Sequence, residues 1–210
     1  MRIEVKNVSK SFNEIGVLKD VDVEFEDGKI YGLLGPNGSG KSVFLKMLCG
    51  YYKPTNGRIL FDGQDIAVKK IFSQRKRDLI ERSKFFPNIT GYENLKMVAR
   101  IKREIFEENI LIALKNVNLL DVKDQKIKEY SDGMKHKLAI AQVLMDDSKI
   151  IILDEPFGGL DDRSIEELSN LLVEAKYRKK IIILAVASKR DIEKIADIIY
   201  EFKCGKLEVA

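Results

Sequence analysis

Residues 35–42 combine the residue types that bind phosphate groups. They spell Gly-Pro-Asn-Gly-Ser-Gly-Lys-Ser, which matches the spacing G-x-x-x-x-G-K-S. Glycines let backbone N–H groups point at a phosphate without a Cβ clash, and the following helix start adds unpaired donors and partial positive charge. Lys41 can reach the β- and γ-phosphates, and the Ser42 hydroxyl can ligate Mg²⁺.

The flanking residues favour this interpretation over a chance glycine-rich turn. An apolar run at 30–34 predicts a strand before the loop, and residues 43–48 predict a helix after it. A strand, a glycine-rich turn and a helix form the context that a phosphate-binding loop requires. The sequence therefore predicts that the chain binds a nucleoside triphosphate.

A second chemical feature follows the apolar run 149–153, which predicts a buried strand. Asp154 and Glu155 come at its carboxyl end, where ligands bind in open α/β sheets. We expect Asp154 to hold Mg²⁺ through water and Glu155 to orient and deprotonate an attacking water. The alternative is a helix-capping or loop acid pair.

Composition narrows the class of protein. The 210 residues suit one domain with a subdomain, and the net charge of +4, from 37 basic and 33 acidic side chains, does not indicate nucleic-acid binding. The densest basic cluster, Arg75–Arg77, is typical of a solvated turn. No apolar run is long enough to cross a bilayer, and the N-terminus lacks the pattern of a signal peptide. Cys49 and Cys204 indicate buried, reduced thiols and a cytosolic chain.

The expected elements group into a core and an insert. Alternating residues at 3–8 and 18–25 predict antiparallel edge strands, with further strands at 30–34, 58–61, 78–81, 149–153 and 181–186 and two short closing strands. Helices are predicted at 66–76, 92–101, 106–117, 134–145, 161–177 and 190–196. The result is a single α/β domain at 1–210, with the core at about 1–82 and 149–210 and a helical subdomain at about 83–148.

Five ordered motifs give a resemblance to a known family. They are the phosphate loop, the helical insert, Ser131-Asp132-Gly133 opening a helix, the run 150–156, and Gly158-Gly159-Leu160-Asp161. Together they resemble the ATP-binding subunit of ABC transporters over essentially the whole chain. The resemblance implies a P-loop NTPase core, ATP and Mg²⁺ as ligands, and two subunits stacked head to tail around two ATP molecules.

The resemblance also assigns roles to individual positions. It implies nucleotide contacts at Phe12, Gly35, Pro36, Asn37, Gly38, Ser39, Gly40, Lys41, Ser42 and Val43, and contacts to the ATP of the other subunit at Ser131, Gly133 and Met134. Lys41 and Glu155 are the implied catalytic residues, and Ser42, Asp154 and Glu81 the implied metal ligands. Phe12 matches the aromatic that stacks on adenine, or is simply an edge-strand residue. Asp161 matches a residue of the dimer interface, and also suits a helix N-cap.

Three positions depart from the family pattern. Glu81 stands where the family usually has Gln. Asp132 replaces the first Gly of the signature, which puts a negative charge near a γ-phosphate unless its side chain turns outward to cap the helix. Either Ser131 or Asp132 could be the N-cap of this helix. The third departure is Ala187, at the position of the family's switch histidine. The only histidine of the chain is His136, so we expect slow hydrolysis unless Lys189 or a partner's residue substitutes.

The resemblance implies a function outside the chain itself. Tyr130-Ser131-Asp132-Gly133-Met134 and Thr90–Leu95 are most similar to the subgroup that exports peptide antibiotics, drugs or bacteriocins. We therefore expect a motor subunit on the cytosolic face of a membrane, whose partners are a second ATP-binding subunit and a separate membrane-spanning subunit. The alternatives are a non-transport ATPase such as an assembly factor, or a weakly hydrolysing regulatory subunit.

Overall fold

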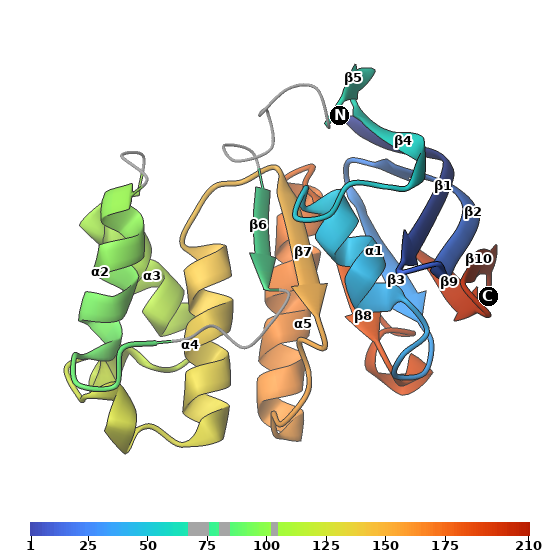
Figure 1. Ribbon diagram of the computed structural model, residues 1–210. Coiled ribbons are helices and arrows are strands. Elements are labelled where there is room, and N and C mark those ends of the chain that lie inside the picture. The colour runs from blue at the N-terminus through green and yellow to red at the C-terminus, as the bar shows by residue number, and fades with distance from the viewer. Residues whose placement is uncertain (67–75, 80–84, 102–104) are drawn as a thin grey trace. The chain divides into compact units, whose positions relative to one another are not determined.

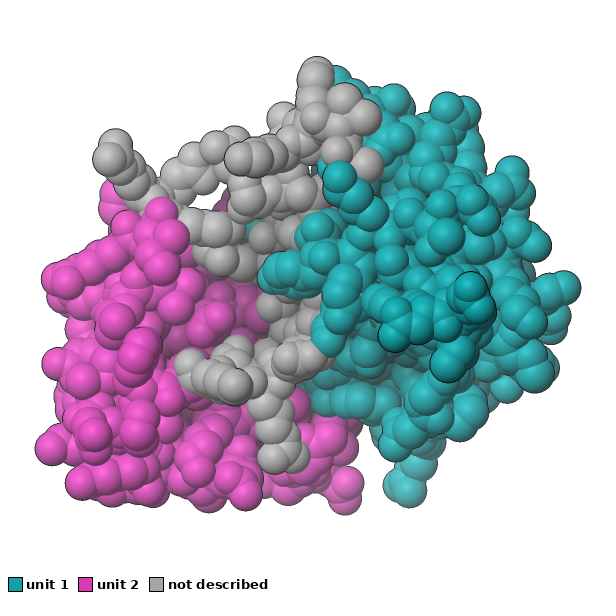
Figure 2. Space-filling model, viewed as in Figure 1, with its two compact units in different colours: residues 1–80, 148–156, 172–210 teal, residues 81–147, 157–171 magenta. Residues whose placement is uncertain are grey.

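The computed structural model describes residues 1–66, 76–79, 85–101 and 105–210 (Figure 1). The chain forms two compact units (Figure 2). Unit 1 comprises residues 1–80, 148–156 and 172–210, and unit 2 comprises residues 81–147 and 157–171. The phosphate loop and the acidic pair belong to unit 1, whereas the Ser131 helix start belongs to unit 2.

Unit 1 contains a mainly parallel sheet of six strands. Its order is β10 (Lys206–Val209), β9 (Ile198–Lys203), β3 (Lys29–Leu34), β8 (Ile181–Val186), β7 (Ile150–Asp154) and β6 (Lys76–Leu79). Every neighbouring pair is parallel except β9 and β10. Every residue of β8 is buried, as are the first four of β7, which explains why these strands are continuous apolar runs. The mainly parallel sheet predicted from the sequence is confirmed.

A second, antiparallel sheet forms the edge of unit 1. Its order is β2 (Ile15–Glu26), β1 (Arg2–Phe12), β4 (Asn56–Phe61) and β5 (Gln64–Asp65). Asn13 and Glu14 join β1 to β2 with φ values of 46° and 69°, the left-handed conformation that two-residue hairpins require. Alternation along β2 puts Leu18, Val21, Val23 and Phe25 in the core, as predicted.

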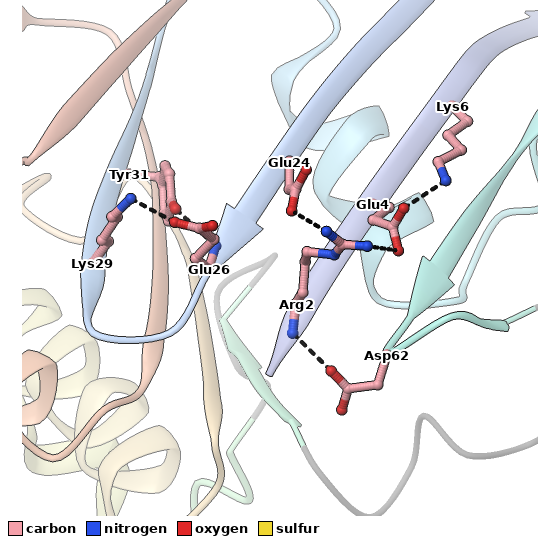
Figure 3. A network of polar contacts seen from close by, with 8 residues as sticks. All are labelled: Arg2, Glu4, Lys6, Glu24, Glu26, Lys29, Tyr31 and Asp62. Atoms are coloured by element: carbon pink, nitrogen blue, oxygen red, sulfur yellow. Dashed lines mark hydrogen bonds and ion pairs between the residues drawn. The ribbon is translucent and has the colours of Figure 1, made fainter.

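Charged side chains cover part of this antiparallel sheet (Figure 3). Arg2 bridges Glu4 and Glu24 at 3.0 Å each, and Lys6 donates to the other oxygen of Glu4 at 2.5 Å. The backbone N–H of Arg2 donates to Asp62, which closes the network across β1 and the end of β4. Glu4 is only 8% exposed, yet both of its oxygens are paired.

Helix α1 (Lys41–Leu48) belongs to the same hydrophobic core as both sheets. It packs on β7 and β8 (Figure 1), and Phe44, Leu45, Met47 and Leu48 are fully buried. These four side chains share one core cluster with apolar residues from the antiparallel sheet and from the parallel sheet. The phosphate loop at the start of α1 is therefore held by a helix that is fixed by burial.

Unit 2 is helical in its described part. It contains α2 (Gly91–Ile101), α3 (Glu107–Asn116), α4 (Asp132–Leu144), residues 162–171 of α5 (Asp162–Tyr177) and short 3₁₀ turns at Leu120–Val122 and Ile127–Glu129. Thr90 and Glu93 form a capping box at the start of α2, with N–H···O distances of 2.8 and 3.0 Å. A Cβ on Gly91 would lie 2.4 Å from the hydroxyl of Tyr130. The two motifs that resemble the antibiotic-export subgroup therefore contact each other.

Several sequence predictions need correction. The helix predicted at 190–196 is wrong, because only Lys189–Asp191 forms a short 3₁₀ turn before further turns. Cys204 is exposed rather than buried, whereas Cys49 is buried as expected. Lys76 and Arg77 lie in β6 and not in a turn. The helix predicted at 66–76 lies mostly outside the described residues, and so does Glu81.

Candidate nucleotide site

The phosphate loop connects the end of β3 to the start of α1. Gly40 is the N-cap of α1 with a φ of 104°, and an added Cβ would lie 2.8 Å from the Leu18 side chain. Gly38 has a φ of 80°, and among the described residues only its own chain neighbours would lie within 4 Å of an added Cβ. Position 40 thus needs glycine for two reasons, its positive φ and the close approach of β2. Position 38 favours glycine only because of its positive φ, since space for a side chain is available there.

Lys41 is the buried cation of this loop, with 5% exposure. Its Nζ atom donates to the carbonyl oxygens of Gly35 at 2.5 Å and Pro36 at 3.1 Å. An ammonium group has three donors, so a third direction is available for a phosphate oxygen. The loop itself therefore holds the lysine side chain in place.

Other polar atoms of the loop suit a bound triphosphate. Ser39 Oγ is buried and lacks a hydrogen-bond partner among the described residues, which costs free energy unless a ligand supplies one. Ser42 is exposed in the first turn of α1, and Val43 is half-buried beside it. The donor set therefore fits a triphosphate, and the accessible Ser42 hydroxyl fits Mg²⁺.

The acidic pair lies at the end of β7, two strands from β3. Both Asp154 and Glu155 are half-buried. Glu155 has a backbone φ of 49°, which is uncommon for a residue other than glycine. Its backbone N–H donates to the carbonyl oxygen of Ala185 at 2.9 Å. Its Oε1 atom is buried without a hydrogen-bond partner among the described residues. A strained backbone and an unpaired carboxylate oxygen are features of a functional site.

Electrostatics tie Glu155 to the phosphate loop. Burial raises the pKa of its carboxyl above the ordinary value of 4.5, and the nearby Lys41 ammonium partly opposes that rise. A hydrogen bond from the backbone of Ala187 also lowers this pKa, whereas the carboxylates of Asp154 and Asp191 raise it. The structure thus brings Lys41, Asp154 and Glu155 together, as expected from the sequence.

The segment after β8 contains Ala187, the position at which the resemblance to the family predicts a histidine. The pKa of Glu155 is affected by the backbone of Ala187 and the carboxylate of Asp191. The Lys189 side chain is exposed in the 3₁₀ turn. Ala187 thus offers Glu155 a backbone donor and has no imidazole. Neither this backbone bond nor the influence of Asp191 could be seen in the sequence, because both depend on the pairing of β7 with β8.

An aromatic group lies at the end of β1. Phe12 is 39% exposed and packs edge to face with Tyr52, with ring centroids 5.4 Å apart. The Nζ atom of Lys10 lies 4.7 Å from the centre of the Phe12 ring. The sequence singled out Phe12, whose role in base stacking stays a prediction. Its contacts with Tyr52 and Lys10 were not predicted, although the pair Tyr51-Tyr52 after α1 was a visible signal.

In unit 2, the predicted site residues lie at the start of α4. Ser131 is the N-cap of α4, and its Oγ accepts the N–H of Met134 at 3.1 Å. A cavity of about 180 Å³ is lined by Asp132, Gly133, His136 and the loop Gly158-Gly159 among others. The Asp132 side chain is 86% exposed and pairs with Lys135 at 3.3 Å, so it turns outward and does not cap the helix.

Asp161 has the structural role that the sequence allowed. Its Oδ1 accepts the backbone N–H of Ser164 at 2.8 Å, directly before α5. Hydrogen bonds from the hydroxyl and backbone of Ser164 lower the pKa of the Asp161 carboxyl. Asp161 is therefore the N-cap of α5, and a role at a subunit interface stays a prediction.

A strand, a glycine-rich loop and a helix, with an acidic strand end nearby in the same sheet, define a P-loop nucleoside triphosphatase. The ABC transporter family matches residues 18–158, which is more than half of the chain. The chain therefore belongs to the ABC transporter family, as one of its ATP-binding subunits. The resemblance inferred from the sequence motifs is confirmed.

Curated relatives align along nearly the whole chain. An uncharacterized ABC transporter ATP-binding protein of Bacillus subtilis, YybJ, is 34% identical over 99% of this chain and 95% of its own length. The lantibiotic transport ATP-binding protein SrtF of Streptococcus pyogenes is 32% identical over 98% of this chain and 88% of its own. The bacitracin transport ATP-binding protein BcrA of Enterococcus faecalis is 34% identical over 94% of this chain and 65% of its own. These relatives favour transport over the non-transport alternatives.

Solved structures agree with the fold. An ATP-binding subunit of an ABC transporter matches with a TM-score of 0.89 and 26% identity, over 99% of this chain and 88% of that one. A dimeric bacterial ABC transporter cassette matches with a TM-score of 0.88 and 25% identity, over 98% and 96% of the two chains. No helix in the described part of the chain is long and apolar enough to span a membrane.

Proposed function

We propose that this chain is the ATP-driven motor of a membrane exporter whose cargo is a peptide antibiotic or a similar compound. The buried Lys41 ammonium beside the unpaired Glu155 oxygen is the observation that carries the ATPase assignment. The export assignment is supported by relatives named for lantibiotic and bacitracin transport. The paired Thr90–Glu93 and Tyr130 motifs are consistent with that subgroup.

Residues of unit 1 hold the substrate in this proposal. Backbone N–H groups of residues 35–42 and the Lys41 ammonium bind the β- and γ-phosphates, and Phe12 stacks on the base. Ser42 and Asp154, together with Glu81, would hold Mg²⁺, which supplies charge neutralisation on the phosphate oxygens when bound. The exposed Ser42 hydroxyl and the half-buried Asp154 are compatible with that role.

Glu155 is the general base of hydrolysis. Its ionised carboxylate accepts a proton from water as that water attacks the γ-phosphorus, and the bond from this phosphorus to the bridging oxygen of the β-phosphate breaks, so that ADP leaves. Lys41 stabilises the negative charge on the phosphate oxygens during this step. Ala187 offers only its backbone N–H near this carboxylate, so the water is less well positioned than it would be beside an imidazole. We therefore expect turnover well below the enzymatic median of about 10 per second.

The complete site requires a second subunit. Ser131, Gly133 and Met134 at the start of α4 would contact the γ-phosphate held by the other subunit, because a helix N-terminus favours an anion. The second subunit is another copy of this chain or a paralogue. ATP-driven closure of the pair then moves a separate membrane-spanning subunit, which keeps this chain at the cytosolic face of the membrane.

Purification from membranes tests the export assignment. A tagged chain expressed in its native host should co-purify, after mild detergent extraction, with a protein that has several apolar segments of about 20 residues. Recovery of the chain alone, with none of it in the membrane fraction, would contradict the assignment.

The role of Lys189 is tested separately by the rate of ATP hydrolysis. Lys189→Ala should leave turnover within about twofold of the unmodified chain, because this side chain is exposed in the 3₁₀ turn. Its matched control is Arg190→Ala, which removes an exposed cation from the same turn. Abolished turnover in Lys189→Ala alone would show that this lysine replaces the histidine.

A further inference from the structure

Two side chains hold the exposed ring at the end of β1. Tyr52 packs edge to face on Phe12 with the rings inclined at 75°. The Lys10 ammonium lies 4.7 Å from the centre of the Phe12 ring and 5.8 Å from that of Tyr52. Such contacts restrict the rotation of a ring that would otherwise be free at the tip of a hairpin.

The same two residues are anchored by backbone contacts. Lys10 Nζ donates to the carbonyl of Lys53 at 2.9 Å. The segment after α1 is tied to the end of β1 by Thr55, whose N–H donates to Ser9 and whose Oγ1 accepts from Ser11, at 2.8 and 3.0 Å. Tyr52 is thus carried by a segment that is fixed to β1 at three points.

This segment is also continuous with the helix of the phosphate loop. The N–H of Tyr52 donates to the carbonyl of Lys46 in α1 at 3.3 Å, and the Lys46 ammonium lies 5.9 Å from the Tyr52 ring. Helix α1 begins at Lys41 and is locked in the core. One rigid path therefore connects the phosphate-binding end of α1 to the Phe12 ring.

We propose that Lys10 and Tyr52 are positioning residues for the nucleotide base, which set the angle and the electron density of the Phe12 ring. This inference rests on the proposed function, because it requires the base to stack on Phe12. A cation over an aromatic ring withdraws electron density from it, and a depleted ring attracts an electron-rich purine more strongly. The edge-to-face contact of Tyr52 holds the Phe12 ring in one orientation before the base binds. The Phe12 side chain therefore loses no further rotational entropy on binding.

Magnesium tripolyphosphate separates base binding from phosphate binding. It occupies the phosphate loop and has no base, so calorimetric titration with magnesium ATP and with magnesium tripolyphosphate reports the two contributions separately. Lys10→Met should weaken ATP binding about threefold and Tyr52→Leu about fivefold, with tripolyphosphate binding unchanged. In steady-state hydrolysis both variants should raise KM and keep kcat.

Matched variants control for charge and folding. Lys53→Met removes a cation from the same segment, and Tyr51→Leu removes the exposed neighbouring ring, so both should bind ATP normally. Lys10→Arg and Tyr52→Phe preserve the cation and the ring, and should retain the affinity of the unmodified chain.

Each result leads to a distinct conclusion. Equal weakening of ATP and tripolyphosphate in Lys10→Met or Tyr52→Leu would show damage to the loop and overturn the positioning role, and unchanged ATP binding in both variants would overturn it too. Phe12→Ala tests the proposed base site itself, with an expected loss of about tenfold or more for ATP alone. If Phe12→Ala has no effect on ATP binding, the proposed base site is wrong. If Phe12→Ala weakens ATP binding and the Lys10 and Tyr52 variants do not, the base site stands and only the positioning role of Lys10 and Tyr52 fails.

Discussion

Two glutamates of unit 1 lie in opposite electrostatic surroundings. Glu4, on the antiparallel sheet, is largely buried, and its two oxygens accept hydrogen bonds from Arg2 and Lys6 (Figure 3). Glu155, at the end of β7, has one buried oxygen without a hydrogen-bond partner among the described residues. The hydrogen bonds from Lys6 and Arg2 lower the pKa of Glu4 despite its burial, whereas burial raises the pKa of Glu155.

In the mechanism that we propose, this difference separates a structural carboxylate, Glu4, from a reactive one, Glu155. A carboxylate with both oxygens paired stabilises its sheet and has little capacity left to accept a proton from a substrate. A desolvated carboxylate with an unpaired oxygen is a stronger base than a fully paired one. Burying it destabilises the folded chain, and other interactions of the fold offset that loss of stability. The same residue type therefore has a lowered pKa at one position and a raised pKa at the other, because the neighbouring groups differ.

Removing the cation near each glutamate should give the largest contrast. Lys41→Ala should weaken ATP binding by about 100-fold, because charge-assisted hydrogen bonds to phosphate are lost from a buried site. Lys6→Ala, the matched change beside Glu4, should leave ATP binding unchanged. Calorimetric titration measures both, and normal ATP affinity in Lys41→Ala would overturn the site assignment.

Restoring an imidazole near Glu155 should give the next largest effect. Ala187→His should raise the rate of ATP hydrolysis by about tenfold or more, because it adds a side chain that can orient the attacking water beside Glu155. Ser188→His, one residue later in the same exposed segment, is the control and should stay near the unmodified rate. Equal rates for Ala187→His and the unmodified chain would mean that the missing histidine does not limit turnover.

The two glutamates should affect stability in opposite directions with pH. The folded-state pKa of Glu4 is lowered, so its contribution is present above the ordinary value of 4.5 and is lost as pH falls through the folded value. The folded-state pKa of Glu155 is raised, so stability falls as pH rises from 4.5 through the folded value. At neutral pH, Glu4→Gln should lower the thermal unfolding midpoint and Glu155→Gln should raise it slightly. Shifts of the same sign would contradict this comparison.

The sequence predicted the parts of the molecule that repeat a local pattern. The phosphate loop, the apolar strands β7 and β8 and the helices α2 to α5 follow from periodicity and spacing, because burial dictates their side chains. It did not predict that residues 190–196 leave the helical conformation. Ile192 explains this result, because its side chain is fully buried and lies where a Cβ on Gly32 of β3 would be, so packing on the sheet overrides local helix propensity.

The site was only partly predictable for the same reason. Lys41, Asp154 and Glu155 could be singled out from the sequence because each occupies a fixed place in a local motif. The support of Phe12 by Tyr52 and Lys10 joins residues from separate elements, so it depends on strand register and on the path of the segment after α1. The outward turn of Asp132 toward Lys135 likewise depends on Ser131 being the N-cap.

Hydrolysis by Glu155→Gln, measured across pH together with ATP binding, tests the central claim most directly. The unmodified chain should show a rate that rises with pH through a midpoint above 4.5, since the raised pKa of Glu155 delays its ionisation. Glu155→Gln should bind ATP normally and hydrolyse it at least about 100-fold more slowly, without that rise. Hydrolysis by Glu155→Gln at the unmodified rate, with the same dependence on pH, would show that another group is the base.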